Sequence, residues 1–413
     1  MAKKFAILGL SLLLLAGCGQ MDASVEKVQD SISSIQIFTG GRQPEPASEP
    51  TEREVVPQNR DESDSVPETL PPVSPNYVAF ERISRDEIDP EGIHLLTENR
   101  CIAEFHSDDP ELSEWVGGLL RENRQHFDSS SRNLLQYARE VIEEYGTETF
   151  YTYSNYEDQA LTRHDSHVAS FVTVSHVHAG GAHPNTVQTA QNLDLQQKKV
   201  LRLEDIIEPD QADRLLEMVQ KSVRDKFEPL GLNALYEEAP ESIARSMQYG
   251  EMTPYWYFEP DALVIFYNQY ELGPYAAGII KAEMPYEALR GVLKEEFVPH
   301  GNPNGSEEMS VTDELDGREP ISVKLGDEPD QILLAVDGRI REIQISEVIW
   351  VDETPVSQRM MLSVSEMDES QVLAVTGGFV DESRSFAVEY VDGAGNRQLQ
   401  YLRSDGLSDR PQH

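Results

Sequence analysis

Three histidines lie close together in the sequence, at His176, His178 and His183. Alternate side chains of a β-strand point to the same face, so a strand here would place His176 and His178 side by side. His183 follows Gly180-Gly181, a pair that permits a tight turn. Imidazole nitrogens are common zinc ligands, but no nearby carboxylate completes a ligand set, and His183 is better suited to capping a turn by hydrogen bonding. The pattern favours turn histidines over a metal site, and we expect no bound cofactor.

A second group of chemically able residues lies in the most aromatic stretch after the N-terminus, Pro254 to Tyr286. Gly273-Pro274 imposes a bend, and the bend is expected to display Tyr270, Glu271 and Tyr275. Two tyrosine rings and a carboxylate at a turn are suited to contacting a ligand. Aromatic residues on strands are more often part of the core. Both interpretations stay open on the sequence alone.

Motifs of the common hydrolases and phosphate binders do not occur in the sequence, which has no G-x-S-x-G, H-E-x-x-H or Gly-rich phosphate loop. Glu259, Asp261 and Glu271 are candidate acids only because they are neighbours in the sequence. Cys101 lies on an apolar predicted strand, and reactive thiols need a cationic, exposed setting, so we expect this thiol to be buried and inert. The sequence favours a protein that is not an enzyme.

The N-terminus has the features of a secretory leader. Lys3-Lys4 precede an apolar run from Phe5 to Ala16, which is too short to cross a bilayer as a helix. Leu15-Ala16-Gly17-Cys18 then resembles the cleavage box of bacterial lipoproteins. The resemblance implies that residues 1–17 are a signal peptide and that acyl chains on Cys18 anchor the protein durably to a membrane. The alternative is an ordinary secretory leader that happens to hold a cysteine.

The predicted location is therefore the cell envelope, on the extracytoplasmic side. Position 19 is Gly rather than Asp. By the usual sorting pattern of the lipoproteins that the leader resembles, this implies the outer membrane if the organism has one. The chain has 34 Lys and Arg against 74 Asp and Glu, a net charge of −40. Such a charge excludes nucleic acid as a partner and attracts basic proteins, although an acidic surface that keeps the protein soluble is the simpler explanation.

The elements that must position these residues alternate between helix and strand. Asp109-Pro110 and Asp128 to Ser131 both have the features of helix starts, so two helices are predicted, the second ending at Gly146. Val168 to His178 alternates clearly, as a strand does. The remaining predicted helices are Met21 to Thr39, Glu208 to Phe227 and Tyr286 to Phe297. The remaining predicted strands before residue 300 are Val78 to Ile83, His94 to His106, Thr149 to Tyr156, Thr186 to Leu195, Lys199 to Leu203, Tyr255 to Phe258, Ala262 to Tyr267 and Ile279 to Met284.

Composition divides the chain into regions. Residues 18–76 are predicted to be a Pro- and Glu-rich tether, because such a stretch cannot bury enough apolar surface to fold. Residues 77–298 are predicted to form an α+β region with antiparallel sheets and packed helices, in two subdomains of about 77–147 and 148–298. After a linker at 299–310, about seven short strands at 311–404 predict an immunoglobulin-like β-sandwich, and residues 405–413 a disordered tail.

Two motifs taken together resemble a known family. One is Gly180 to Pro184 followed by Asn192 to Leu195 and Leu203 to Ile207; the other is Tyr270-Glu271 with Gly273 to Gly278. They are similar to the extracytoplasmic domain of unknown function 3298, which occurs in the RsiV anti-sigma factor and in PdaC-type peptidoglycan deacetylases. The resemblance extends over about Thr149 to Phe297 and more weakly over Val78 to Gly146. It implies a binding role, since the RsiV domain recognises lysozyme.

This chain departs from both relatives. Its sequence has neither the transmembrane helix and cytoplasmic anti-sigma segment of RsiV nor the metal motif of the deacetylases. We therefore expect a lipid-anchored envelope binding protein whose partner is a basic extracytoplasmic protein such as lysozyme, or a peptidoglycan-type glycan. The alternatives are a metal-assisted hydrolase of envelope polymer that uses His176, His178 and His183, and a structural envelope lipoprotein. The residues expected to contact the ligand are Gly180, Gly181, His183, Tyr270, Glu271 and Tyr275.

Overall fold

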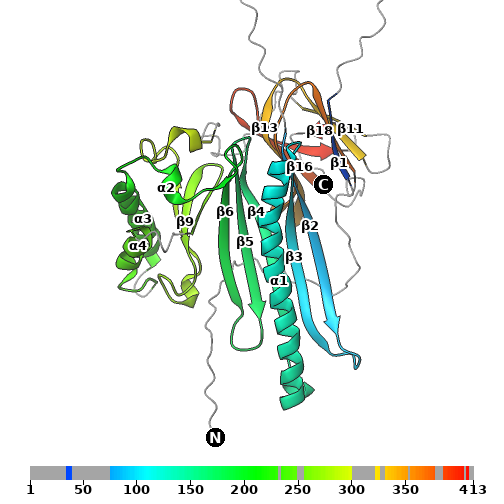
Figure 1. Ribbon diagram of the computed structural model, residues 1–413, viewed down its shortest axis with the longest axis vertical. Coiled ribbons are helices and arrows are strands. Elements are labelled where there is room, and N and C mark those ends of the chain that lie inside the picture. Colours follow the sequence, from blue (N-terminus) through cyan, green and yellow to red (C-terminus); the bar gives the residue numbers. More distant parts are fainter. Residues whose placement is uncertain are drawn as a thin grey trace, which may run out of the picture.

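The computed structural model describes residues 34–39, 75–230, 234–248, 255–299, 321–325, 331–351, 354–376, 385–403 and 406–408. They form an α+β fold, as predicted, and its sheets are one large and two smaller ones, with one long helix (Figure 1). Cys18 and the predicted signal peptide lie outside the described residues, as do most of the predicted tether, linker and tail. Among the helices of the described part, none combines the length and apolarity needed to cross a membrane.

The main sheet has 11 strands in the order β18-β17-β16-β13-β14-β2-β3-β4-β5-β6-β7. Neighbouring strands are antiparallel except β3 and β4, which run parallel because α1 carries the chain back along the sheet between them. Strand β5 has the predicted bounds. The first six strands of this sheet along the chain are β2 (Tyr77–Ile88), β3 (His94–His106), β4 (Tyr153–His164), β5 (Val168–His178), β6 (Asn185–Asp194) and β7 (Lys199–Val200).

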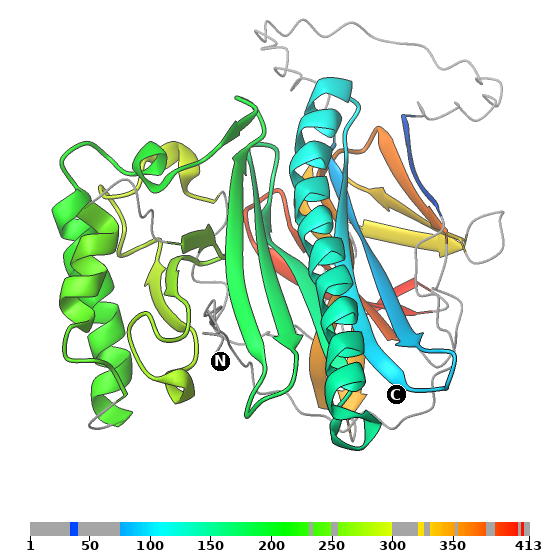
Figure 2. The ribbon, with the colours of Figure 1, turned by 60° about the horizontal axis from the view of Figure 1, so that its bottom comes forward.

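Helix α1 (Pro110–Tyr145) covers one face of this sheet (Figure 2). It begins where predicted, because Asp109 accepts hydrogen bonds from the Glu111 and Leu112 amides, and it ends at Gly146. The prediction of two helices was wrong. Asp128 to Ser131 lie inside a single helix, where each of the two end residues has a tertiary partner rather than a capping role.

Those tertiary partners fix the middle of α1 to the sheet. Arg100 pairs with Asp128 at 2.9 Å, and Asn155 Nδ2 donates to Ser131 Oγ at 2.8 Å. Glu157, the register partner of Arg100 on β4, is 6% exposed. Burial raises the pKa of Glu157 to about 7, although Arg100 and Ser175 act in the opposite direction.

Glu157 makes the stability of the fold depend on pH. Its folded pKa lies above the value of about 4.3 expected for an unfolded glutamate, so the stabilising proton is lost as pH rises towards 7. Glu157→Gln should remove this dependence and raise the free energy of unfolding by about 1–2 kcal/mol at pH 8. Urea unfolding between pH 5 and 8 measures both effects, with Glu122→Gln on the exposed face of α1 as control. Parallel pH profiles of wild type and Glu157→Gln would contradict the assignment.

The chain after β7 forms helices that cover one face of a three-stranded antiparallel sheet of order β10-β9-β8. The opposite face packs on the main sheet, where Tyr257, Val264 and Phe266 meet Val172. The elements are α2 (Leu203–Ile206), α3 (Ala212–Phe227), α4 (Ala239–Gln248), β8 (Tyr255–Phe258), β9 (Ala262–Tyr267) and β10 (Ile280–Pro285), with single 3-10 turns η2 (Glu228–Leu230), η3 (Tyr275–Ala277) and η4 (Glu295–Phe297).

The closing helix predicted at Tyr286 to Phe297 was wrong. The segment forms successive turns and bridges, with only η4 helical. Gly291 has a φ of 72°, outside the helical region, and the Lys294 amide donates to the Ile206 carbonyl rather than to its own turn. Tertiary pairing with the α2 segment therefore replaces helix formation here.

The C-terminal region is rich in strands, as predicted, and consists of two sheets that share one apolar core. A four-stranded sheet of order β1-β15-β12-β11 packs on β13, β14 and β16 of the main sheet. The strands are β11 (Ile321–Leu325), β12 (Gln331–Val336), β13 (Ile340–Val351), β14 (Thr354–Met367), β15 (Gln371–Thr376), β16 (Ser385–Val391), β17 (Arg397–Arg403) and β18 (Gly406–Ser408).

Strand β1 (Ser34–Thr39) comes from the N-terminal part of the chain and pairs antiparallel with β15. The helix predicted over Met21 to Thr39 was therefore wrong for these six residues, and the strand interrupts the predicted tether. The main sheet also crosses both expected domain boundaries, since β3 pairs with β4 and β2 pairs with β14.

Candidate functional site

The turn between β5 and β6 carries three of the predicted contact residues. Gly180 and Gly181 have φ values of 80° and 101°, a region that glycine enters without strain. His183 follows them and stacks on Tyr275, with ring centroids 4.0 Å apart and an interplanar angle of 24°. The structure therefore brings together the two segments that the sequence analysis paired.

The second segment forms an aromatic corner, Asn268 to Gly278, after β9. The Asn268 side chain fixes this corner to the main sheet, because its Oδ1 accepts from the Gln188 amide at 2.9 Å and its Nδ2 donates to the Gln188 carbonyl at 3.1 Å. Glu271 is exposed, and its carboxylate accepts from the Asn268 amide at 2.7 Å. Partial burial of that carboxyl group raises the pKa of Glu271 despite this hydrogen bond.

Tyr270 lies at the tip of the corner. Its φ is 64°, a strained region for an aromatic residue, and its side chain is 44% exposed. The ring centroids of Tyr270 and Tyr275 are 6.1 Å apart. A strained backbone that holds a large ring in solvent is a feature of contact sites rather than of cores.

Two buried polar atoms of the corner have no hydrogen-bond partner. Gln269 is 2% exposed; its Nε2 donates to the Tyr275 carbonyl at 2.9 Å, but its Oε1 is unpaired. The hydroxyl of Tyr275 is also buried and unpaired. Buried polar atoms are usually satisfied, and leaving one unpaired costs about 1–3 kcal/mol. A ligand or water that supplied these two bonds would recover part of that free energy.

A second group of aromatic residues lies on the other side of the β5–β6 turn. A Cβ on Gly180 would lie 3.9 Å from Tyr153, which stacks on Tyr137 with centroids 5.8 Å apart. Tyr137, Tyr145 and Tyr151 are exposed large hydrophobic side chains, Tyr151 being 76% exposed. These residues were not among the predicted contact residues, although the density of tyrosine from Tyr145 to Tyr156 was a usable signal.

The end of α1 beside these tyrosines is negative. The sequence from 140 to 148 contains Glu140, Glu143, Glu144 and Glu148, and the last turn of α1 holds no basic residue. The helix dipole adds partial negative charge at this end. A hydrogen bond to Glu144 raises the pKa of Tyr145, so this phenol remains neutral in ordinary buffers.

The histidines of the alternative metal site are engaged elsewhere. His176 stacks on Tyr156 with centroids 5.8 Å apart, and its Nδ1 lies 2.7 Å from Thr186 Oγ1. His183 stacks on Tyr275. No group of three or more His, Cys, Asp or Glu in the described part of the chain is placed to hold a metal ion, so the three histidines do not form such a group. Cys101 is buried, as predicted, and burial raises the pKa of its thiol to about 12.

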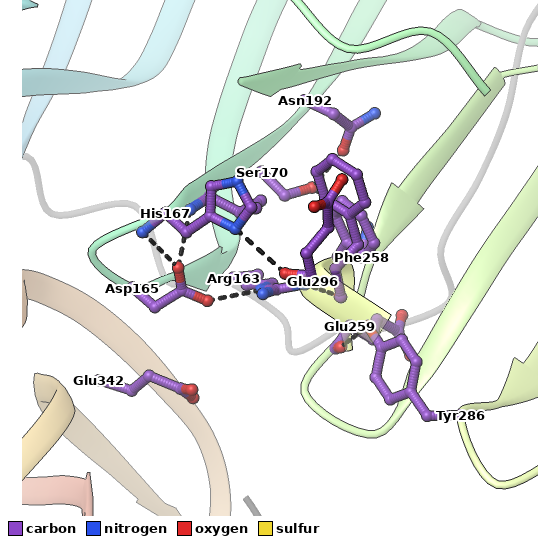
Figure 3. A network of polar contacts seen from close by, with 12 residues as sticks. Arg163, Asp165, His167, Ser170, Asn192, Phe258, Glu259, Tyr286, Glu296 and Glu342 are labelled. Carbon is purple, nitrogen blue, oxygen red and sulfur yellow. Dashed lines mark hydrogen bonds and ion pairs between the residues drawn. The ribbon is translucent and has the colours of Figure 1, made fainter. Parts of the chain in front are cut away.

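A buried polar network lies where β4, the closing segment and β13 meet (Figure 3). Arg163 pairs with Asp165 at 2.7 Å, donates to the Phe297 carbonyl and lies over the Phe258 ring. Ser170 and Asn192 link the main sheet to the backbone of β8. Arg163 and Asp165 pair with each other at its centre, so the network holds these parts of the fold together.

Comparison with known proteins gives a family match over part of the chain and no activity. Residues 204–287 match the family DUF3298, described as a protein of unknown function. A DUF3298 family member from Bacteroides fragilis NCTC 9343 is 18% identical over 52% of this chain and 94% of its own, with a TM-score of 0.41. A DUF3298 family protein from Pseudomonas aeruginosa PAO1 is 18% identical over 54% of this chain and 97% of its own, with a TM-score of 0.38. No curated protein matches.

Proposed function

We propose, from the DUF3298 domain at residues 204–287 and the surface that it presents, that this protein is a lipid-anchored binding protein of the cell envelope. Its partner is a basic extracytoplasmic protein. The stacking of His183 on Tyr275 carries the proposal, because it joins the β5–β6 turn to the aromatic corner in one exposed surface. The anchor is the acylated Cys18 implied by the lipoprotein-like leader.

The side chains of this surface suit a protein partner. Tyr270, Tyr275 and His183 present rings at modest cost in conformational entropy, and tyrosine is enriched among residues that dominate binding energy. The tyrosines beyond Gly180 extend the same surface. Arginine and lysine side chains bind over tyrosine faces, so a basic partner would contact both the rings and the carboxylates.

The charge of the chain points in the same direction. A net charge of −40 steers basic partners towards the protein, and the glutamates at the end of α1 concentrate negative charge beside the tyrosines. Attraction of this kind acts mainly on the association rate and weakens with added salt.

A peptidoglycan-type glycan is the second candidate. The unpaired Gln269 Oε1 and Tyr275 hydroxyl favour it, since sugars supply hydroxyl and amide groups that would satisfy both atoms. Aromatic rings beside such polar atoms provide faces on which a sugar ring can lie. This candidate predicts binding that changes little with salt if the glycan is neutral.

We expect hen lysozyme, as a basic probe, to bind the purified chain in a calorimetric titration at low salt. Tyr270→Ala should weaken the affinity about tenfold, because truncating an interface tyrosine commonly costs more than 1 kcal/mol. Val200→Ala is the control, because the Val200 side chain is 43% exposed, a fraction similar to the 44% of Tyr270. Val200 pairs with Leu193, at the end of β6 that is opposite to the β5–β6 turn. It should bind like wild type.

The salt dependence separates the candidates. Binding of lysozyme that weakens steeply from low to physiological salt supports the basic-protein version. No binding at low salt overturns it, because attraction is greatest there. The glycan would be favoured if the chain co-sediments with purified peptidoglycan, Tyr275→Ala abolishes this co-sedimentation, and lysozyme does not bind.

A further inference from the structure

Strand β1 is the one described element that comes from the first 74 residues of the chain. All six of its residues pair with β15, from Ser34 opposite Thr376 to Thr39 opposite Gln371. The middle of β15 is buried, with Leu373 and Val375 in the core of the C-terminal region. Without β1, the backbone of β15 would be an open edge, a state that proteins usually avoid.

The position of β1 in the sequence limits how far the folded body can lie from the predicted anchor. About 16 residues separate Cys18 from Ser34, and they reach at most about 55 Å when fully extended. About 59 residues separate Cys18 from β2 at Tyr77, and these would reach about 200 Å. Pairing of β1 with β15 therefore shortens the maximum reach to roughly a quarter.

The two ends of the molecule are distinct. Strand β1 lies at the end formed by the C-terminal sheets, whereas the β5–β6 turn and the last turn of α1 lie at the opposite end of the main sheet (Figure 1). The strands between these ends, such as β5 with 11 residues, span about 35 Å. An attachment point at β1 is thus far from the tyrosine-bearing surface.

We propose that β1 is a clasp that holds the C-terminal sheets next to the bilayer, so that the tyrosine-bearing surface points away from it. The inference rests on the proposed lipid anchor at Cys18. In this orientation the C-terminal sheets face the lipid surface. The opposite end of the molecule is then accessible to a protein that diffuses outside the cell.

Cysteine cross-linking tests the clasp itself. Gln36 and Ala374 are opposite each other in the register, so Gln36→Cys with Ala374→Cys should form an intramolecular disulfide on mild oxidation of the full chain. The monomer would then migrate faster on a non-reducing gel. Ile37→Cys with Ala374→Cys is the matched control, because a shift of one residue turns the side chain to the other face. A disulfide-linked dimer, or equal yields from the two pairs, would overturn the clasp.

A vesicle assay tests the orientation without cellular acylation. Residues 18–413 are coupled through Cys18 to a maleimide lipid in vesicles with anionic lipid and headgroup acceptors, and a donor is introduced by non-natural amino acid labelling. A donor at Ala394, in the β16–β17 turn, should transfer energy more efficiently than one at Glu148. In the edge strand β1, one of any two adjacent amides faces β15, so Gln36→Pro with Ile37→Pro removes a ladder hydrogen bond and should reduce the difference.

Equal transfer from the two positions in the unmutated chain, or greater transfer from Glu148, overturns the orientation. Since the coupling is chemical, that result is independent of whether cells acylate Cys18. Conversely, absence of labelling by palmitate in cells would count against the proposed anchor while leaving the cross-linking result intact.

Discussion

Arg163→Met is expected to destabilise the protein by about 3–5 kcal/mol, the usual cost of removing one partner of a buried ion pair. The guanidinium pairs with Asp165 at 2.7 Å, donates to the Phe297 carbonyl and lies 4.7 Å from the centre of the Phe258 ring. Methionine has similar bulk but no positive charge. It would leave a carboxylate and a carbonyl unpaired at the junction of three parts of the fold. Urea unfolding at pH 7 measures the loss.

The same substitution should change how stability depends on pH. Burial acts to raise the pKa of Asp165, but Arg163 and the Val168 and His167 amides together hold it below its usual value. A lowered pKa stabilises the fold above the unfolded value of about 3.9, and the contribution is lost as pH falls below it. The difference between wild type and Arg163→Met should therefore narrow below about pH 4.

Arg121→Met is the matched control for this experiment. Arg121 also forms an ion pair, with Glu114, but both side chains are largely exposed. Exposed pairs contribute roughly 0–1 kcal/mol, so this variant should unfold almost like wild type. Similar losses in the two variants, or a loss below about 1 kcal/mol in Arg163→Met, would show that the buried network does not hold the fold together.

Gly273→Ala is expected to cost about 2–3 kcal/mol, because the added methyl group has no room. A Cβ at this position would lie 2.6 Å from the Ala234 carbonyl oxygen and 3.0 Å from Ala277 Cβ. The hydrogen bond from the Tyr236 amide to the Leu272 carbonyl holds the two segments together, so neither can move freely. The aromatic corner must shift, and lysozyme binding should weaken along with stability.

Gly118→Ala provides the comparison for this prediction. Gly118 lies within α1, and the nearest atom to an added Cβ is the end of the flexible Arg121 side chain at 3.8 Å. Alanine is a better helix former than glycine, so this variant should gain about 0.5–1 kcal/mol. Thermal unfolding of both variants checks the opposite signs. A Gly273→Ala protein as stable as wild type would mean that the close approach at the corner does not exist.

The sequence predicted the elements whose formation depends mainly on residues close together in the chain. Strict alternation gave the bounds of β5, and a capping aspartate followed by proline gave the start of α1. The apolar run from Ala262 to Tyr267 gave β9. The pairing of Gly180 to Pro184 with Tyr270 to Tyr275 came from the family resemblance, and the stacking of His183 on Tyr275 confirms that these segments meet.

The errors share one cause, which is that distant parts of the chain decided the local structure. Asp128 has the features of a helix start, yet Arg100 on β3 binds it in the middle of α1. The segment from Tyr286 to Phe297, at the end of the α+β region, bridges back to Ile207 through Leu293 instead of forming a helix. Pairing between Ser34–Thr39 and β15, more than 330 residues apart, leaves no local trace in either segment. Gln269 became a site candidate only when its unpaired buried oxygen was known.

One packing contact limits how this domain can be exchanged between genes in evolution, namely that of Tyr257, Val264 and Phe266 on Val172. The family match begins at residue 204, so Val172, on β5, lies outside it. A gene segment limited to the match would encode a sheet with one bare apolar face, prone to aggregate. Lineages that shuffle this unit into new genes must therefore inherit the supporting hairpin with it, or evolve another cover for that face.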